Sequence, residues 1–356
     1  MAETALATTL SHEIALIRFS RSLGRNAQPH IDAIMKALRE ELLSTDTILT
    51  KKRRDELIAL VNELIGVELG GWSEEIESEL VALAKEEAKF HQAALSNLIG
   101  RKIARPTLES IIKTAFNTEM VLNNQAYTVD ERIKYYNANS ADRIKRIITG
   151  GWRDGLTTYE MSQQIMGRQN SSVSNQMKKG AFTLAKDVTS HISSTAKTSV
   201  GMANQDVAIG EQVTVTLDSR TSPICQRLGS LDAGGKEYYY AKDGFNFPRP
   251  PFHWNCRSTM RYILAPEFKE LEEPRTRPAI VSGKAKRVDS EKSWMQVAKE
   301  NPSLARESLG EERAKVLDAM SAEEFTKIAY DRLNQPIPLD ELVKKSKKAA
   351  KALSKE

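Results

Sequence analysis

Apolar residues recur every three or four positions through the first hundred residues, which is the spacing of one face of an α-helix. The pattern is carried by Ile31, Ile34, Met35, Leu38, Leu42, Leu57, Leu60, Val61 and Leu64. Proline and glycine favour breaks between helices, so we predict breaks at Pro29, at Asp46 and at the pair Gly70–Gly71. Residues 1–105 are therefore predicted to form a helical hairpin or bundle.

A second helical stretch follows Pro106, and its longest periodic segment covers residues 129–149. The pair Gly150–Gly151 is predicted to end that helix. We interpret residues 106–158 as a helical connector between the first bundle and the rest of the chain.

The next segment begins with a capping signal. Thr157 is followed three residues later by Glu160, which is the spacing of a capping box before a short helix. A long helix is expected over residues 173–206, because that stretch lacks proline and repeats apolar residues on one face. Its many Ala, Ser and Thr residues favour close packing against neighbouring helices.

The period of the pattern changes from about 3.6 to two after Gly210. Val213, Val215 and Leu217 alternate with threonines, which predicts a strand. Further short strands are predicted at Glu237–Tyr240 and Met260–Leu264. A small antiparallel sheet is the simplest arrangement, within a compact module spanning residues 159–266.

The last part of the chain is polar and then helical again. Residues 266–290 are rich in charge and proline, which indicates a linker or extended arm. Helical spacing returns over residues 294–342. We predict a linker and a mobile, basic, helical C-terminal arm over residues 267–356. The fold class is therefore α+β and predominantly helical, with a helical N-terminal half and a small antiparallel-sheet module.

Composition narrows the class of protein. The 356 residues are 40% hydrophobic and 28% charged, a balance typical of globular domains. No apolar run reaches the roughly 20 residues that cross a bilayer, and the first residues lack the pattern of a signal peptide. We expect synthesis in cytosol and no contact with membrane. Two cysteines do not make a disulfide framework in a chain of this length.

The net charge of +5 permits contact with nucleic acid without requiring it. Most basic clusters have the ordinary interpretation of a solvated helix face. The tail is the stronger candidate, because it holds lysines with no acidic residue until Glu356. These candidate contacts to double-stranded DNA are Lys344, Lys345, Lys347, Lys348 and Lys351. Such an arm would gain affinity by releasing counterions from phosphates.

The richest candidate chemistry lies between Asp218 and Arg257, where both cysteines occur. Cys225, His253 and Cys256 are soft ligands of the kind that zinc prefers. A structural site needs a fourth ligand, for which Asp218 is the main candidate; water and Ser258 are weaker ones. Two alternatives stay open: the cysteines are ordinary buried side chains, or they form a disulfide.

This region also carries a family resemblance. Its elements are Asp-x-Arg-Thr at Asp218–Thr221, Cys225, Leu228–Gly229, and Pro251-x-His253-x-x-Cys256-Arg257. Together they resemble the signature of phage Mu F-like minor head proteins, also called phage head morphogenesis proteins. The resemblance extends over about Tyr159 to Leu342. Downstream it includes Trp294, Asn301–Pro302, Leu309–Gly310 with Arg313, and Pro338–Leu342.

Two departures from the family pattern concern the metal. Members commonly have Cys-Pro-x-Cys and His-x-x-Cys-Arg-Cys, whereas Ser222 and Ser258 replace the outer cysteines here. A serine hydroxyl stays protonated near neutral pH and is a poor zinc ligand, which excludes a site of four thiolates. If Asp218 caps a turn instead of binding metal, three ligands remain and the loop could be free of metal.

The resemblance implies a virion protein that is synthesised in the host cytoplasm and present in a few copies. It implies association with the portal, and with scaffold and capsid proteins, during head assembly and DNA packaging, retention or ejection. Arg220, Thr221 and Arg257 belong to the structural motif. We expect the two arginines to pair with carboxylates that orient the loop or belong to a partner.

Enzyme motifs are missing from the sequence. There is no Walker loop, no Gly-x-Ser-x-Gly and no dinucleotide fingerprint, and His12-Glu13 lacks the second histidine of His-Glu-x-x-His. The protein is therefore expected not to be an enzyme. The alternative is a metal- or thiol-dependent hydrolase delivered with the phage genome, in which Cys225 and His253 would form a nucleophile pair.

Overall fold

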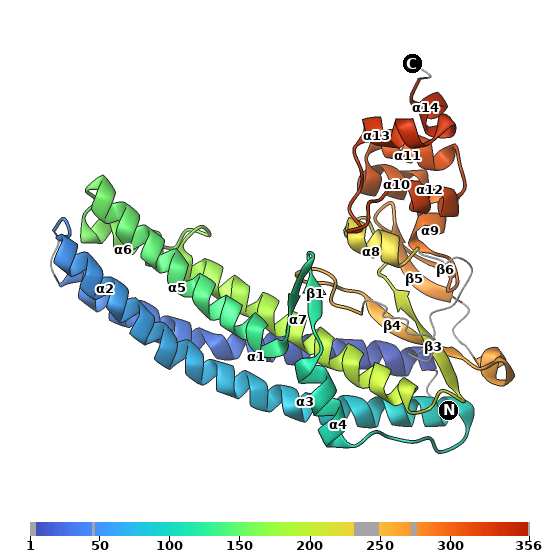
Figure 1. The fold of residues 1–356 in the computed structure, drawn as a ribbon, viewed down its shortest axis with the longest axis horizontal. Coiled ribbons are helices and arrows are strands. Elements are labelled where there is room, and N and C mark those ends of the chain that lie inside the picture. Colours follow the sequence, from blue (N-terminus) through green and yellow to red (C-terminus); the bar gives the residue numbers. More distant parts are fainter. Residues whose placement is uncertain (1–4, 45–46, 231–248, 272–275, 355–356) are drawn as a thin grey trace.

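A computed structural model describes residues 5–44, 47–230, 249–271 and 276–354. The described chain forms two units set at an angle, a long bundle of helices and a shorter unit that rises from one end of it (Figure 1). The strand predicted at Glu237–Tyr240 lies outside the described residues. The α+β, predominantly helical class is confirmed. The described residues form helices α1 to α14 and three two-stranded antiparallel sheets.

The bundle begins with two very long helical segments. Helix α1 spans Ala5–Leu43 and contains Pro29 without a break. Helix α2 (Lys51–Leu64) runs through a π-helical turn, η1 (Ile65–Leu69), into α3 (Gly70–Ile99).

The break predicted at Gly70–Gly71 is therefore wrong. Leu69 and Trp72 on either side are fully buried, and their packing outweighs the cost of about 1 kcal/mol per helical glycine.

The connector holds a short helix, a hairpin and a long helix. Helix α4 spans Leu108–Asn117, strands β1 (Met120–Leu122) and β2 (Gln125–Tyr127) form the hairpin, and α5 spans Val129–Asp154. Helix α5 continues through the glycine pair that was predicted to end it. Gly151 has a packing role instead, because a Cβ there would lie 2.7 Å from Met161 Cγ on the next helix.

The next two helices follow the sequence prediction. Helix α6 spans Thr158–Met166 and begins with the predicted capping box between Thr157 and Glu160. Helix α7 spans Val173–Met202 and lies against α1, α3 and α5 (Figure 1). It is buried on several sides, which accounts for its many small residues.

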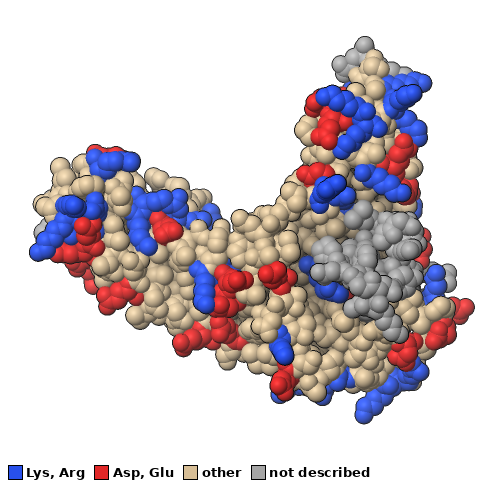
Figure 2. All heavy atoms as spheres, viewed as in Figure 1, with Lys and Arg blue, Asp and Glu red and all other residues tan. Residues whose placement is uncertain are grey.

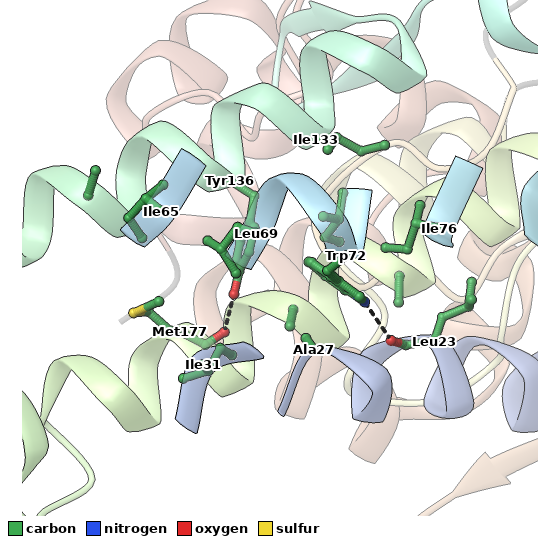
Figure 3. Packing of buried hydrophobic residues seen from close by; sticks show 14 of the residues in the cluster. Leu23, Ala27, Ile31, Ile65, Leu69, Trp72, Ile76, Ile133, Tyr136 and Met177 are labelled. Atoms are coloured by element: carbon green, nitrogen blue, oxygen red, sulfur yellow. Dashed lines mark hydrogen bonds between the residues drawn. The ribbon is translucent and has the colours of Figure 1, made fainter. Parts of the chain in front are cut away.

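The bundle core joins residues from all of these helices. Trp72 is fully buried, and its indole Nε1 donates to the Leu23 carbonyl at 3.3 Å. The Tyr136 hydroxyl donates to the Met177 carbonyl at 3.0 Å. Figure 3 shows both bonds among the surrounding apolar side chains. Both of these buried polar atoms thus have a hydrogen-bond partner, as burial favours.

The second unit begins with a short antiparallel pair. Strand β3 (Ala208–Thr214) pairs with β4 (Thr259–Leu264). Strand β4 confirms the strand predicted at residues 260–264, whereas β3 begins before the predicted alternation of residues 213–217 and overlaps only its start. The short helix α8 (Pro223–Leu228) follows β3, and the 3₁₀ turn η3 (Pro266–Leu271) follows β4.

The stretch predicted as a linker forms a hairpin. Strands β5 (Thr276–Val281) and β6 (Lys284–Asp289) pair across a turn in which Ser282 and Gly283 both have positive φ. The hairpin attaches to the module through a hydrogen bond from Ile280 N–H to the Leu217 carbonyl. The prediction failed because the burial of one hairpin face outweighs the polar composition of the segment.

The C-terminal helices pack with this module around a second apolar core. They are α9 (Trp294–Glu300), α10 (Pro302–Leu309), α11 (Glu311–Asp318), α12 (Ala322–Ile328), α13 (Leu339–Lys345) and α14 (Lys347–Leu353). Buried residues of this core run from Val213 to Ala349. The described part of the C-terminal arm is therefore packed. Among the described helices, none is both long and apolar enough to cross a bilayer.

Candidate metal centre

The two halves of the candidate site come from segments almost thirty residues apart. Cys225 lies on α8, whose start is set by Pro223 and by the Ser222 side chain, which accepts from Cys225 N–H at 3.4 Å. His253 and Cys256 lie on the loop that leads into β4. A hydrogen bond from Cys256 N–H to the His253 carbonyl curls this loop so that both side chains turn toward α8.

The three predicted ligands meet. The Cys225 and Cys256 sulfurs are 3.7 Å apart, and His253 Nε2 lies 3.2 Å from Cys225 Sγ. All three ligand atoms lie within 4.8 Å of one another. A zinc ion with Zn–S bonds of about 2.3 Å needs a sulfur–sulfur edge of about 3.8 Å in a tetrahedron. The separation of the two thiols therefore fits zinc.

The orientation of His253 also fits a ligand. Its Nδ1 lies 2.9 Å from the Trp254 carbonyl, which can only accept, so Nδ1 carries the proton. Nε2 then presents its lone pair to Cys225. Holding the distal nitrogen in this way is the usual means of fixing the tautomer of a metal-binding histidine.

Ser258 stands beside the three ligands. Its hydroxyl donates to Cys225 Sγ at 3.0 Å, and the side chain is buried. The other serine, Ser222, is used as the cap of α8. The replacement of two cysteines by serines thus leaves one hydroxyl at the site and one at a helix start.

The structure does not place Asp218 with the three ligands. Arg257 donates to both of its carboxylate oxygens, at 2.7 and 2.8 Å. The same carboxylate accepts from Arg220 N–H at 3.1 Å and lies 3.1 Å from the Thr221 hydroxyl. The prediction of Asp218 as fourth ligand is therefore corrected: the carboxylate caps a turn and binds Arg257.

Hydrogen bonding from Arg257 lowers the pKa of Asp218 and outweighs the opposing effect of burial. The Arg257 pKa is raised by the same contact. The Arg220 guanidinium is 78% exposed and 3.8 Å from Asp218, so this second arginine adds little to the pair.

The two buried thiols influence each other strongly. The hydrogen bond with Cys256 and burial raise the pKa of Cys225, and the same hydrogen bond, followed by that of His253, lowers the pKa of Cys256 well below its usual range. Burial is the largest single effect on His253 and lowers its pKa, but the hydrogen bond with Cys256, the charge of Cys256 and the hydrogen bond with the Trp254 carbonyl together outweigh burial, so the pKa is raised. One thiolate is therefore favoured at Cys256, which suits metal binding.

The loop that carries His253 and Cys256 is clamped onto the bundle. Asn255 N–H donates to Asp187 Oδ1 at 3.1 Å, and Lys186 Nζ donates to the Asn255 carbonyl at 2.8 Å. Asp187 also pairs with Arg132 of α5 at 3.1 Å, and that guanidinium stacks 4.4 Å from the centre of the Trp254 ring. The candidate site is thus rigidly connected to α5 and α7.

These supporting residues are not predicted from the sequence. Burial raises the pKa of Asp187 to about 6, against the opposing charge of Arg132. The available signal was the pair Lys186–Asp187 within the apolar spacing of a long helix. Charged residues at buried positions need partners, and here the partner is the candidate metal loop.

The five C-terminal lysines lie on α13 and α14, and all are exposed. They are not on a free arm, because Leu342 and Ala349 bury those helices against the second core. Lysines 344, 345 and 348 lie 3.7, 2.9 and 2.6 Å from Asp340, Glu341 and Glu324, respectively. Their role in binding DNA stays a prediction, with part of their charge already balanced.

Comparison of the chain with protein-family models, with curated proteins and with solved structures gave no match.

Proposed function

We propose that this chain is a minor head protein of a tailed phage or prophage, associated with the portal during head assembly and DNA packaging, retention or ejection. One observation carries the proposal. The residues that resemble the head morphogenesis signature come from separate segments and gather in one buried site, where Cys225 meets His253 and Cys256. Beside it, Asp218 pairs with Arg257. Motif residues that come together in space support the resemblance more strongly than a match along the sequence alone.

The shape supports an assembly role. A long bundle and a compact C-terminal unit diverge from the region of strands β3 and β4 that lies between them (Figure 1). Lys and Arg side chains gather with some acidic ones at the far tip of the bundle (Figure 2). The same region exposes the apolar side chains of Ile48 and Tyr159. We propose this tip as a contact surface for a partner protein.

The proposed role of the metal is structural. Zinc held by Cys225, His253 and Cys256 would link α8 to the loop before β4, and Ser258 or a water molecule would complete the set. Bound zinc would supply cross-linking strength and no reaction. Cys256→Ser is expected to release one zinc per chain, measured by mass spectrometry of purified protein. An unchanged zinc content would show that these three residues do not hold a structural zinc ion.

The expected partners are the portal protein, scaffold and capsid proteins, and double-stranded DNA through the exposed lysines of α13 and α14. DNA contact is tested by replacing Lys347 and Lys351 with glutamine. The control is the double variant Lys89→Gln/Lys134→Gln, because these two exposed lysines lie on the bundle, outside the proposed DNA contact. Weaker DNA retention in the variant of Lys347 and Lys351, with a reduced salt dependence, is expected. Retention that does not depend on salt would argue against DNA contact.

A hydrolase is the second candidate, because Cys225 Sγ and His253 Nε2 are 3.2 Å apart, as in a thiol–imidazole pair. Two observations weigh against it. Cys225 is only 2% exposed, and its pKa is raised rather than lowered, whereas a nucleophilic cysteine needs an accessible thiolate. Cys225→Ala decides between them: loss of a measurable hydrolysis with intact particle assembly would favour the enzyme.

A further inference from the structure

A second cluster of metal-binding side chains lies in the bundle, away from the cysteines. His12 lies near the start of α1, and Glu87 and His91 lie one turn apart on α3. His12 Nε2 is 3.0 Å and His91 Nε2 is 3.5 Å from the same carboxylate oxygen, Glu87 Oε2. The three ligand atoms all lie within 4.8 Å of one another.

The cluster is buried and held in place. The exposed fractions of the His12, Glu87 and His91 side chains are 13%, 3% and 8%. The His12 ring stacks on Phe90 at 3.5 Å between ring centres. The Ser193 hydroxyl of α7 donates to Glu87 Oε2. Three helices therefore fix the position of these groups, as a site with preorganised ligands requires.

An ordinary ion pair does not account for the whole cluster. His12 can donate to Glu87, whereas the buried His91 Nε2 lies 3.5 Å from the same carboxylate oxygen without a well-formed hydrogen bond. A buried polar group without a well-formed hydrogen bond destabilises the fold. A cation shared by the two imidazoles and the carboxylate would engage all three at once.

A buried amine, Lys197, acts electrostatically on His91 of the cluster. Its Nζ donates to the Met260 carbonyl and lies 5.1 Å from the centre of the Tyr262 ring. Glu13 and Glu87 both act on Lys197 electrostatically.

We propose that His12, Glu87 and His91 form a divalent transition-metal site of the zinc class. Two imidazoles and one carboxylate are a donor set that zinc accepts, with a water molecule in the fourth position. Glu87 and His91 come from one turn of α3, and His12 comes from α1, so the metal links the two helices. Its physical effect is to hold the first turns of α1 on α3.

The test compares zinc content in two histidine variants of the full chain. His12→Gln removes one ligand at the most accessible position of the cluster. His30→Gln is the matched control, because His30 also joins α1 to carboxylates, at 3.1 Å from Glu68 and 3.6 Å from Glu75, without a second histidine. After loading with zinc and dialysis, H12Q should hold one zinc fewer per chain than H30Q. This difference does not depend on the cysteine site.

Affinity provides the quantitative readout. Loss of a direct ligand should weaken zinc binding at this site by more than about 100-fold, because even indirect partners are worth about 10- to 100-fold. Equal zinc content in H12Q, H30Q and the unmodified protein would overturn the proposal.

A cobalt titration of the unmodified protein keeps the test decisive if H12Q fails to fold. A second equivalent of Co²⁺ should produce d–d absorption without further thiolate-to-cobalt charge transfer. If thiolate-to-cobalt charge transfer accounts for all of the bound Co²⁺, the proposed site of His12, Glu87 and His91 is ruled out.

Discussion

The structure places Asp218 in a turn and beside Arg257, and not with the three candidate metal ligands. Replacing Asp218 tests this assignment. Asp218→Ala removes the carboxylate that receives two charge-assisted hydrogen bonds from Arg257, one from Arg220 N–H and a contact with Thr221. If Asp218 is a turn cap rather than a ligand, the variant loses stability but keeps its zinc. If Asp218 were a metal ligand, the main effect of the substitution would be loss of zinc.

The magnitude follows from these contacts. Hydrogen bonds to charged groups contribute about 1.5–3 kcal/mol each, and removing one partner of a buried pair costs about 3–5 kcal/mol. Arg257 is 34% exposed, so water takes over part of its solvation once Asp218 is gone. We therefore expect a loss of about 2–4 kcal/mol in the free energy of unfolding. Asp218→Asn keeps one acceptor oxygen for the turn and should lose less.

Urea unfolding followed by circular dichroism measures this loss, and mass spectrometry measures zinc in the same samples. Arg220→Ala is the control, because that guanidinium is exposed and 3.8 Å away; its effect should stay below about 0.5 kcal/mol. Zinc content in D218A should equal that of the unmodified protein. The account is refuted if D218A loses zinc, or if it unfolds with unchanged stability.

Two further predictions concern the bundle. Burial lowers the pKa of His191 from 6.5 to about 4, so the folded state binds fewer protons than the unfolded chain between these values. The stability that depends on neutral His191 is complete above about pH 6.5 and falls by about 3 kcal/mol by pH 4. The free energy of unfolding measured against pH should therefore fall more steeply for the unmodified protein than for His191→Gln. Parallel pH profiles of the two proteins would contradict this prediction. Gly24→Ala should cost about 1–3 kcal/mol, because the added Cβ would lie 2.9 Å from the backbone of Phe182. Gly150→Ala has no atom within 4 Å to meet and should stabilise α5 by about 0.5–1 kcal/mol; thermal unfolding of both variants checks the contrast, and equal shifts would count against close packing of α1 on α7.

Local signals in the sequence predicted elements whose energetics are local. The capping box at Thr157 and Glu160 and the long helix α7 appear where the pattern places them. Each depends on neighbours within a turn or two, or on one continuous apolar face. The strand Thr259–Leu264 follows for a similar reason.

The failures share a different cause, which is packing between distant segments. The glycine pairs at residues 70–71 and 150–151 do not end helices, because buried neighbours such as Trp72 decide the outcome. The hairpin at residues 276–289 depends on attachment to Leu217, some sixty positions away. Single-sequence patterns contain no record of such contacts.

The candidate site was predictable in its chemistry and not in its geometry. Ligand types selected Cys225, His253 and Cys256, and the structure brings them together. The same reasoning chose Asp218, because a carboxylate at a strand end can bind metal or cap a turn. Only the position of Arg257 separates the two roles. His91 was missed because its partner His12 is nearly eighty residues away in sequence.

The central claim is that this chain acts at the portal of a phage head, and co-purification with portal tests it most directly. The full chain and the portal protein encoded in the same genome would be co-expressed, with the Cys225→Ala/Cys256→Ala variant prepared alongside. The account predicts that the unmodified chain elutes with the portal ring in a few copies and that the variant, with its loop no longer stapled to α8, does so less. Separate elution of the unmodified chain and the portal, with heads that form and retain DNA without this chain, would contradict the account.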